Sequence, residues 1–391
     1  MFLFHDLPLH DFPEGPREQV IVERTGHYGR ALEQFLHERG ITIYEVHPQE
    51  HTSRNKSDKR DAQMLAALLY NQVERGVLVT DENQIARRLV PPHETVQLLQ
   101  GLVQHRLELV RESTQRKNKL TAIADELFPE LTQVNSDPNS QSALALRKQY
   151  PSPQDIEKAA LDALCETRLH TRPSRAHLAE LQDLARTTIG TKHPSRRTSL
   201  LLEQKQLIAE LHLLQEHLDV LEEEIETALH ESRDGRILLS FPTIGTTQAS
   251  IILAHMGNVA NYPRASKLRG YMGWSPHQRQ TGTSTDSMTL TKGGNPLLKQ
   301  TMFLVSLTAI RTDTQWRTLY HRLVPRICQF DERTGRYKGR MKVIGRIAGP
   351  MIGLIYVLLR KDYDLLAALA EGEDPPEPEV YERSKHRVRG S

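Results

Sequence analysis

Seven apolar residues between positions 207 and 228 recur at alternating spacings of four and three. Such a heptad repeat is typical of an α-helix that buries one narrow seam against a second helix. Glutamates surround the seam, which predicts a coiled-coil spacer rather than a catalytic element. Its partner could be the helical segment from Pro91 to about Phe128, or the same helix of a second copy. The seam residues are Leu207, Leu211, Leu214, Leu218, Leu221, Ile225 and Ala228.

Composition excludes several classes of protein. A chain of 391 residues suggests about two or three domains. The two cysteines, Cys165 and Cys328, are too far apart in the sequence to suggest a disulfide framework or a zinc site, which fits a reducing cytoplasm. There is no run of about 18 apolar residues, so no membrane span is expected and the expected partners include no membrane. The first residues lack the order of a signal peptide.

Charge is segregated along the chain although the net charge is only +2. Residues 198–230 contain eight acids against the single Lys205, whereas residues 311–346 contain ten Lys or Arg against three acids. A basic face of this kind attracts phosphate backbones. The alternative is a solvated arginine-rich surface without a ligand.

The N-terminal part has the pattern of an α/β fold. QVIVE at 19–23 predicts a strand, Tyr28–Arg39 a helix that Gly40 stops, and ITIYEVH a second strand. A strand–helix–strand unit normally forms a parallel pair with a right-handed crossover.

The C-terminal part resembles a helix-hairpin-helix unit in PTIGTTQASIILAHMGN. There, Gly245 would let backbone amides approach a phosphate at a helix N-terminus. A tight turn between two helices without a ligand is the alternative. Next comes the polar loop HQRQTGTSTDSMTLTKGGN, which could be a spacer or could present a reactive hydroxyl. The Pro-rich charged tail predicts disorder.

Three carboxylates stand out in the α/β part. Glu23 ends the first strand, and Asp58 and Asp61 lie three residues apart at the start of a helix, on one face. Carboxylates placed in this way can converge and hold Mg²⁺, which prefers oxygen ligands. Taken singly, each could be a solvated charge, and Asp58 could be a helix N-cap.

Several segments together resemble one known family. They are VIVERTGHYGRAL, RNKSDKRDAQMLAALL, LVQHRLELVRESTQRKNKLTAIADELFPEL, FPTIGTTQASIILAHMGN, YPRASKLRGYMGWSPHQRQTGTS and TKGGNPLLKQTMF, in the family's order over about two thirds of the chain. The family is that of bacterial insertion-sequence transposases with a RuvC-like DEDD domain and a C-terminal serine-nucleophile domain, the bridge-RNA-guided recombinase type.

The resemblance implies a fold class of α/β plus all-α. The expected domains are a RuvC-like (RNase H-like) domain at 1–95, a helical linker and coiled coil at 96–235, a C-terminal transposase domain at 236–362 and a disordered tail at 363–391. It also implies a DNA transposase or recombinase that binds divalent metal (Mg²⁺), DNA and a structured guide RNA. The family's composite active site implies a homo-oligomer, a dimer or a tetramer, in the bacterial cytoplasm at the nucleoid.

By the same resemblance, Glu23, Asp58 and Asp61 match metal-binding acids of the family, and Thr281-Gly282 fall on its Ser-Gly. Two departures leave the activity open. The strand that carries the family's first Asp is missing, since only 22 residues precede Glu23 and neither Asp6 nor Asp11 lies in such a strand. The chain is therefore expected to be N-terminally truncated.

The second departure is Thr281 itself, whose extra methyl group stiffens χ1 and crowds an in-line attack on phosphorus. Ser284 is a fallback nucleophile. An inactive nucleic-acid-binding remnant is the alternative function, and a metal-dependent nuclease without recombination is a third. In addition to the nucleophile, seven residues are expected to contact nucleic acid. They are Gly245, Arg264, Lys267, Arg269, Lys292, Asn295 and Lys299.

Overall fold

The structure of the chain is a computed structural model that describes residues 19–23, 29–46, 58–71, 87–134, 137–166, 174–281, 285–290, 293–370 and 372–386. These residues are mostly helical and contain three small sheets. This content is compatible with the expected combination of an α/β part and an all-α part. The chain forms two compact units, one of residues 1–100 with 228–391 and one of residues 101–227.

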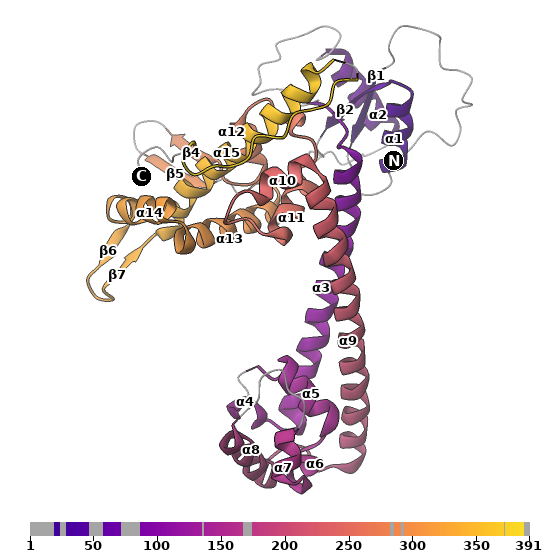
Figure 1. The fold of residues 1–391 in the computed structure, drawn as a ribbon, viewed down its shortest axis with the longest axis vertical. Coiled ribbons are helices and arrows are strands. Elements are labelled where there is room, and N and C mark those ends of the chain that lie inside the picture. The colour runs from indigo at the N-terminus through magenta and orange to yellow at the C-terminus, as the bar shows by residue number, and fades with distance from the viewer. Residues whose placement is uncertain are drawn as a thin grey trace. The chain divides into compact units, whose positions relative to one another are not determined.

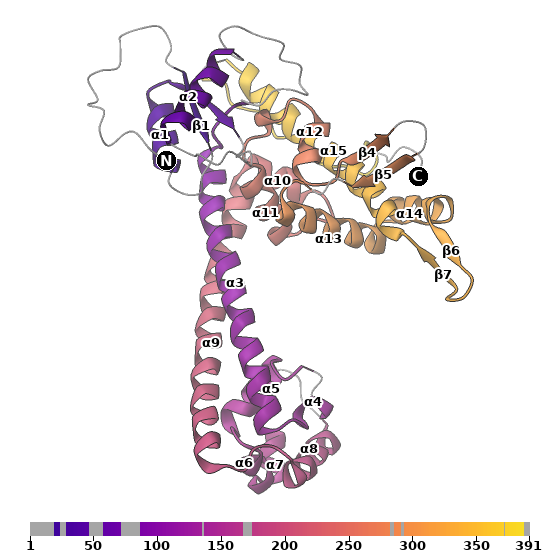
Figure 2. The same ribbon diagram turned by 180° about the vertical axis from the view of Figure 1, so that it is seen from behind.

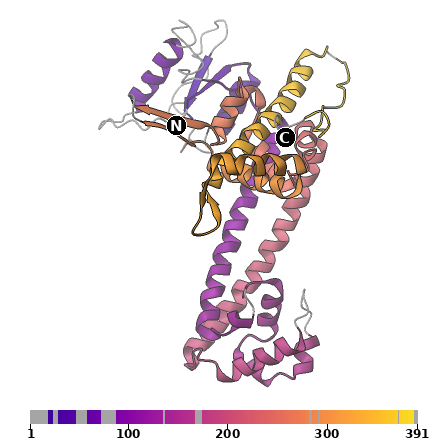
Figure 3. The same ribbon diagram turned by 90° about the vertical axis from the view of Figure 1, so that its left-hand side faces the viewer.

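The N-terminal elements form a small three-stranded sheet with two helices, and the indigo arrows of Figure 3 are its strands. They are β1 (Gln19–Glu23), α1 (Arg30–Glu38), β2 (Thr42–Val46), α2 (Asp58–Leu69) and β3 (Arg87–Arg88). β1 and β2 are parallel and β3 is antiparallel to β2, so the order is β1-β2-β3. α1 contacts β2, and α2 contacts β1. The predicted strand–helix–strand unit is confirmed, while its assignment to a RuvC-like domain stays a prediction.

Two long helices, α3 (Glu94–Leu127) and α9 (Pro194–Glu231), lie side by side and bury the heptad seam between them (Figures 1 and 2). Salt bridges flank the seam, from Arg106 to Glu222 and from Arg116 to Glu210. Along α3 the residue number rises from 106 to 116, while that of the salt-bridge partner in α9 falls from 222 to 210. The two helices are therefore antiparallel. The sequence left two partners open for the seam. In the structure, the seam packs against α3 of the same chain.

Five short helices complete the unit of residues 101–227. They are α4 (Leu131–Val134), α5 (Gln141–Gln149), α6 (Pro153–Lys158), α7 (Leu161–Glu166) and α8 (Arg175–Thr187). Serine hydroxyls cap the N-termini of α5, α6 and α8 by accepting a backbone N–H. The helices enclose a core that includes Leu164, Leu178 and Leu181. The unit lies within the segment, 96–235, that the sequence predicts as a helical linker.

The C-terminal part is a helical cluster with two hairpins. Its elements are α10 (Arg233–Leu239), α11 (Thr246–Met256), η2 (Val259–Asn261), α12 (Ala265–Tyr271), β4 (Pro276–Thr281), β5 (Thr285–Leu290), α13 (Pro296–Thr312), α14 (Thr314–Ile327), β6 (Gln329–Asp331), β7 (Arg336–Lys338) and α15 (Arg340–Ala368). β4 and β5 pair in antiparallel register, so the polar segment expected to be a loop is largely a hairpin. Its threonines are β-branched residues that suit strands.

α15 contacts α10, α12, α13 and α14 and is the central helix of this cluster. Val343, Ile347, Met351, Ile352 and Ile355 are all fully buried along it. Among the described residues α15 is the one helix long and apolar enough to cross a membrane, but 61 % of its most apolar window is buried inside the protein. Its apolar length is therefore explained by its place in the core.

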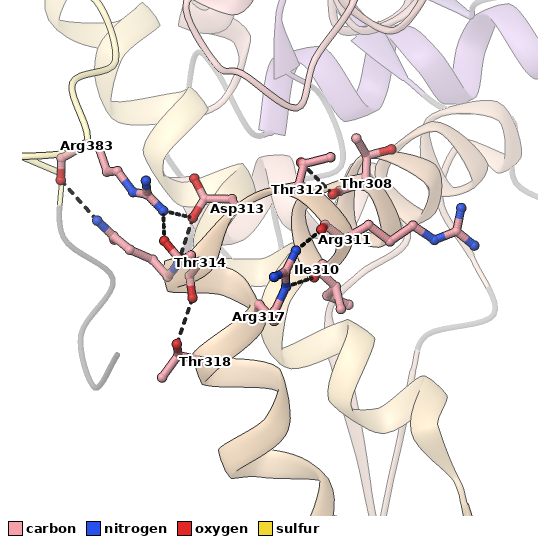
Figure 4. A network of polar contacts seen from close by, with 10 residues as sticks. Thr308, Ile310, Arg311, Thr312, Asp313, Thr314, Arg317, Thr318 and Arg383 are labelled. Atoms are coloured by element: carbon pink, nitrogen blue, oxygen red, sulfur yellow. Dashed lines mark hydrogen bonds and ion pairs between the residues drawn. The ribbon is translucent and has the colours of Figure 1, made fainter.

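The segment from residue 363, which the sequence predicts to be a disordered tail, is described to residue 386 and makes specific contacts. Helix α15 continues to Ala368, and Tyr381 is 7 % exposed with its ring stacked 4.5 Å from that of Phe241. Figure 4 shows Arg383 beside Asp313 and Thr314 at the start of α14, and the Arg383–Asp313 distance is 2.9 Å. A composition rich in Pro and charge predicts disorder only when the charges lack partners, and here they have them.

Candidate functional site

Two glycines bring the turn after α12 against the turn before α13. Gly273 has φ 74° and Gly294 has φ 96°, a left-handed conformation that L side chains rarely adopt. A Cβ atom on Gly294 would lie only 2.6 Å from the backbone N of Gly273. The backbone N–H of Asn295 donates to the carbonyl of Tyr271 at 2.7 Å. Segments 21 to 24 residues apart in the sequence are therefore held together at this point.

An open cavity of about 620 Å³ lies beside these turns. Two of the predicted nucleic-acid contacts, Lys267 and Asn295, line the same cavity. Two serines, Ser266 in the first turn of α12 and Ser275 after the Gly273 turn, also line it. The remaining lining residues are Gly270, Tyr271 and Gly294.

Hydrogen bonds fix the polar groups at one wall of the cavity. Asn295 caps α13, because its Oδ1 accepts from the N–H groups of Leu297 and Leu298 at 3.0 and 3.1 Å. Its Nδ2 lies 3.5 Å from Nδ1 of His255, and the Tyr271 hydroxyl donates to the His255 carbonyl at 3.1 Å. Burial lowers the pKa of His255, which favours the neutral ring. The side-chain oxygen of Asn295 thus has a structural role that the sequence did not predict.

The other predicted basic contacts lie outside the cavity lining. Arg264 is the N-cap residue of α12. Arg269 packs toward α15: a Cβ on Gly349 would be 3.2 Å from its guanidinium, and its Nε is buried without a hydrogen-bond partner among the described residues. Lys299 lies against Gly273, and its carbonyl accepts from the Trp274 indole at 3.2 Å. Lys292 lies outside the described residues.

The predicted nucleophile belongs to the hairpin that leaves this cavity. β4 starts at Pro276, directly after Ser275, and Thr281 is its last residue, paired with Thr285 of β5. Ser284 is outside the described residues, as are the side-chain surroundings of Thr281. The backbone thus presents Thr281 at the tip of a hairpin rather than in an open loop.

The predicted metal-binding positions fall on two elements in contact. Glu23 is the last residue of β1, Asp58 is the first residue of α2, and Asp61 follows one turn later. α2 contacts β1, and a carboxylate site shared by these positions stays a prediction. The side chains of Glu23 and Asp58 are outside the described structure, and the described side chains form no group of three that could hold a metal ion.

The turn between α10 and α11 is tight, but its glycine is already engaged. Gly245 is the N-cap of α11 with φ −90°, a conformation open to any residue, and its N–H donates to Gln248 Oε1 at 3.1 Å. A Cβ at this position would approach the same oxygen to 3.1 Å. Gln248 would have to move before this amide could bind a phosphate.

Sequence reasoning missed two asparagines that join the α/β part to the C-terminal helices. Asn261 Oδ1 accepts from Val90 N–H at 2.8 Å and its Nδ2 donates to the Val90 carbonyl at 3.0 Å. Asn258 Nδ2 donates to the Pro91 carbonyl at 3.0 Å. It also missed His255, Ser266, Tyr271 and Ser275. The available signal was a pair of serines near the glycine turns, Ser266 in the first turn of α12 and Ser275 after its end.

Comparison with known proteins matches both parts of the chain. The family model described as "Transposase IS116/IS110/IS902 family" matches residues 235–321, and a DEDD transposase model of IS110 elements matches residues 14–129. The first match contains the cavity and the β4–β5 hairpin, and the second contains Glu23, Asp58 and Asp61. The two models cover separate segments in the order expected from the sequence.

Individual relatives agree with the family models. The chain is 26 % identical over 314 residues to the insertion element IS110 43.6 kDa protein of Streptomyces coelicolor, covering 78 % of this chain and 71 % of that one. It is 21 % identical over 271 residues to the IS116 44.8 kDa protein of Streptomyces clavuligerus, covering 68 % and 64 %. It is 25 % identical over 239 residues to a mini-circle putative transposase for IS117 of Streptomyces coelicolor, covering 59 % and 55 %. The chain therefore belongs to the IS110/IS116/IS902 family of bacterial insertion-sequence transposases.

Proposed function

We propose that this transposase cuts and rejoins DNA with a hydroxyl nucleophile on the β4–β5 hairpin. The observation that carries the proposal is the cavity at the base of that hairpin. Lys267 supplies positive charge there, and Ser266, Ser275 and Tyr271 supply polar groups. A phosphodiester held at such a site would have its negative charge balanced and its orientation fixed.

In the proposed reaction, the Thr281 oxygen attacks phosphorus. A bond forms between that oxygen and phosphorus, the threonine proton is lost, and a deoxyribose oxygen leaves as a protonated hydroxyl. Attack by the hydroxyl of a second strand on the same phosphorus restores Thr281 and joins the two DNA segments. One phosphodiester is broken and one is made, so no external energy source is required.

We assign Glu23, Asp58 and Asp61 to divalent metal binding, with Mg²⁺ as the cation. Their placement at the end of β1 and the start of α2 supports this assignment, because carboxylate oxygens are the ligands that Mg²⁺ prefers. When bound, the cation would neutralise charge on a phosphate oxygen. Guide RNA and a homo-oligomer complete the proposal. The family resemblance supports both, and the ten basic residues between 311 and 346 support contact with nucleic acid.

A recombination assay tests this function. The full chain, Thr281→Ser and Thr281→Ala are compared in strand transfer on a plasmid that carries the element's ends. Parent and Thr281→Ser are expected to recombine, and Thr281→Ala to lose at least about 10²-fold in rate, equivalent to about 2.7 kcal/mol. Equal recombination by parent and Thr281→Ala rules out Thr281 as the nucleophile.

One observation favours a second candidate function, that of an inactive nucleic-acid-binding protein. Threonine occupies the position where the family resemblance places serine, and its methyl group hinders in-line attack. This candidate predicts that the parent binds the element's ends without recombining them and that Thr281→Ser alone gains activity. The same assay therefore separates the two functions.

A further inference from the structure

The β6–β7 hairpin extends beyond the ends of α14 and α15 (Figures 1 and 2) and is held in one shape by its own residues. Asp331 organises the turn by accepting from Arg333 N–H at 3.2 Å, from the Thr334 hydroxyl at 3.0 Å and from Lys338 Nζ at 2.6 Å. The Lys338 and Thr334 hydrogen bonds lower the pKa of Asp331 and keep it ionised. Gly335 has φ 61° in the turn.

An aromatic ring is displayed on this rigid support. Phe330 is 56 % exposed, and it meets Tyr337 across the hairpin edge-on, with ring centroids 5.1 Å apart. Tyr337 in turn packs against the buried cluster of Val324, Cys328 and Val343. Phe330 is therefore braced from behind by the core while its other face meets solvent.

The same hairpin and the start of α15 also carry exposed positive charge. The hairpin has two exposed arginines, and the first two turns of α15 have three more exposed cations. None of these five side chains has an ion pair or a hydrogen bond to another described residue, whereas the acid Asp331 is neutralised by Lys338. Glu332 is the one other acid of the described hairpin. The five are Arg333, Arg336, Arg340, Lys342 and Arg346.

We propose that the β6–β7 hairpin binds unpaired nucleotides, with a base stacked on Phe330 and phosphates held by Arg333, Arg336 and the basic start of α15. An exposed ring on a segment that also carries unpaired cations matches a base on a charged backbone, and an apolar protein partner would need a wider apolar patch. Duplex DNA hides its base faces in the stack, so the ring favours a single strand. This site lies outside the proposed catalytic cavity and rests on the proposed function only for the class of substrate.

Fluorescence anisotropy of the full chain tests the proposal with labelled oligonucleotides of about 15 nucleotides. The probes are oligo-dT, oligo-rU and a blunt duplex of the same length. Phe330→Ala is expected to weaken single-strand binding about 5- to 100-fold without changing its dependence on salt. Leu365→Ala, at another exposed apolar position in the same unit, is the matched control and should bind like the parent.

Charge and stacking are separated by the salt dependence. Replacing Arg333 and Arg336 by Gln should lower the slope of log affinity against log salt by about 1.4, since each phosphate contact of a single strand contributes about 0.7. A greater loss with oligo-rU or with oligo-dT identifies RNA or DNA as the strand bound.

The proposal is overturned if Phe330→Ala binds both single strands as Leu365→Ala does, or if the parent prefers the duplex and Phe330→Ala changes nothing. If the hairpin proposal fails, the parent still carries out strand transfer on the plasmid. Failure of the proposed function instead abolishes strand transfer while oligonucleotide binding persists. The two failures are thus distinguishable.

Discussion

At the scale of single residues, the cavity depends on backbone conformations that only glycine adopts without strain. Gly294 contributes no side chain to the cavity, yet its φ of 96° and its contact with Gly273 determine where Asn295 and Tyr271 lie. The sequence KGGN predicts a tight turn and a close backbone approach. It could not predict that the approach is to another turn, because nothing local in the sequence pairs Gly294 with Gly273.

Gly294→Ala is expected to disrupt this contact. The added Cβ would lie 2.6 Å from Gly273 N, in a left-handed backbone position. Gly372→Ala is the matched control, because Gly372 has φ 87° and no atom within 4 Å of an added Cβ. Chemical denaturation should show a loss of about 1 kcal/mol for the control and at least about 2 kcal/mol more for Gly294→Ala. Equal losses would show that the two turns can separate without consequence.

At the scale of elements, prediction succeeded where the pattern is long and failed where no pattern in the sequence marks the pairing or packing partner. The heptad seam and the strand–helix–strand unit are periodic over many residues, so both follow from the sequence. The β4–β5 hairpin lacks apolar alternation, and the segment at 372–386 looks disordered by composition. The hairpin is determined by the pairing of β4 with β5, and the segment at 372–386 by its packing on other elements. Phe241, against which Tyr381 stacks, is 140 residues away in the sequence.

The seam itself provides a test with neighbouring residues. Leu214 is 8 % exposed against Leu109 of α3, whereas Leu213 is 52 % exposed. Leu214→Ala should lower the free energy of unfolding by about 2 to 4 kcal/mol, through lost burial and a cavity. Leu213→Ala should change it by less than about 0.5 kcal/mol. Urea unfolding followed by circular dichroism measures both, and a larger effect at Leu213 would place the functional seam on the other face of α9.

At the scale of the whole molecule, the order of the parts along the chain could be predicted, but the joins between them could not. The family resemblance correctly anticipated a DEDD-type segment followed by a C-terminal transposase segment. Asn258 and Asn261, which fasten residues 90–91 to the helical cluster, have no distinguishing pattern in the sequence. Long-range hydrogen bonds of this type depend on the assembled fold. The metal-binding acids and Thr281 stay predictions at this scale.

The most direct test of the transposase chemistry is to trap the protein–DNA linkage. The full chain is incubated with Mg²⁺, a plasmid carrying the element's ends and any RNA that the element encodes, then denatured and digested. Mass spectrometry is expected to find a nucleotide bonded through phosphate to Thr281 in the parent, and none in Thr281→Ala. A linkage at Ser284 would contradict the assignment of Thr281 as the nucleophile. No linkage in either the parent or Thr281→Ser would contradict the assignment of the β4–β5 hairpin as the site of attack.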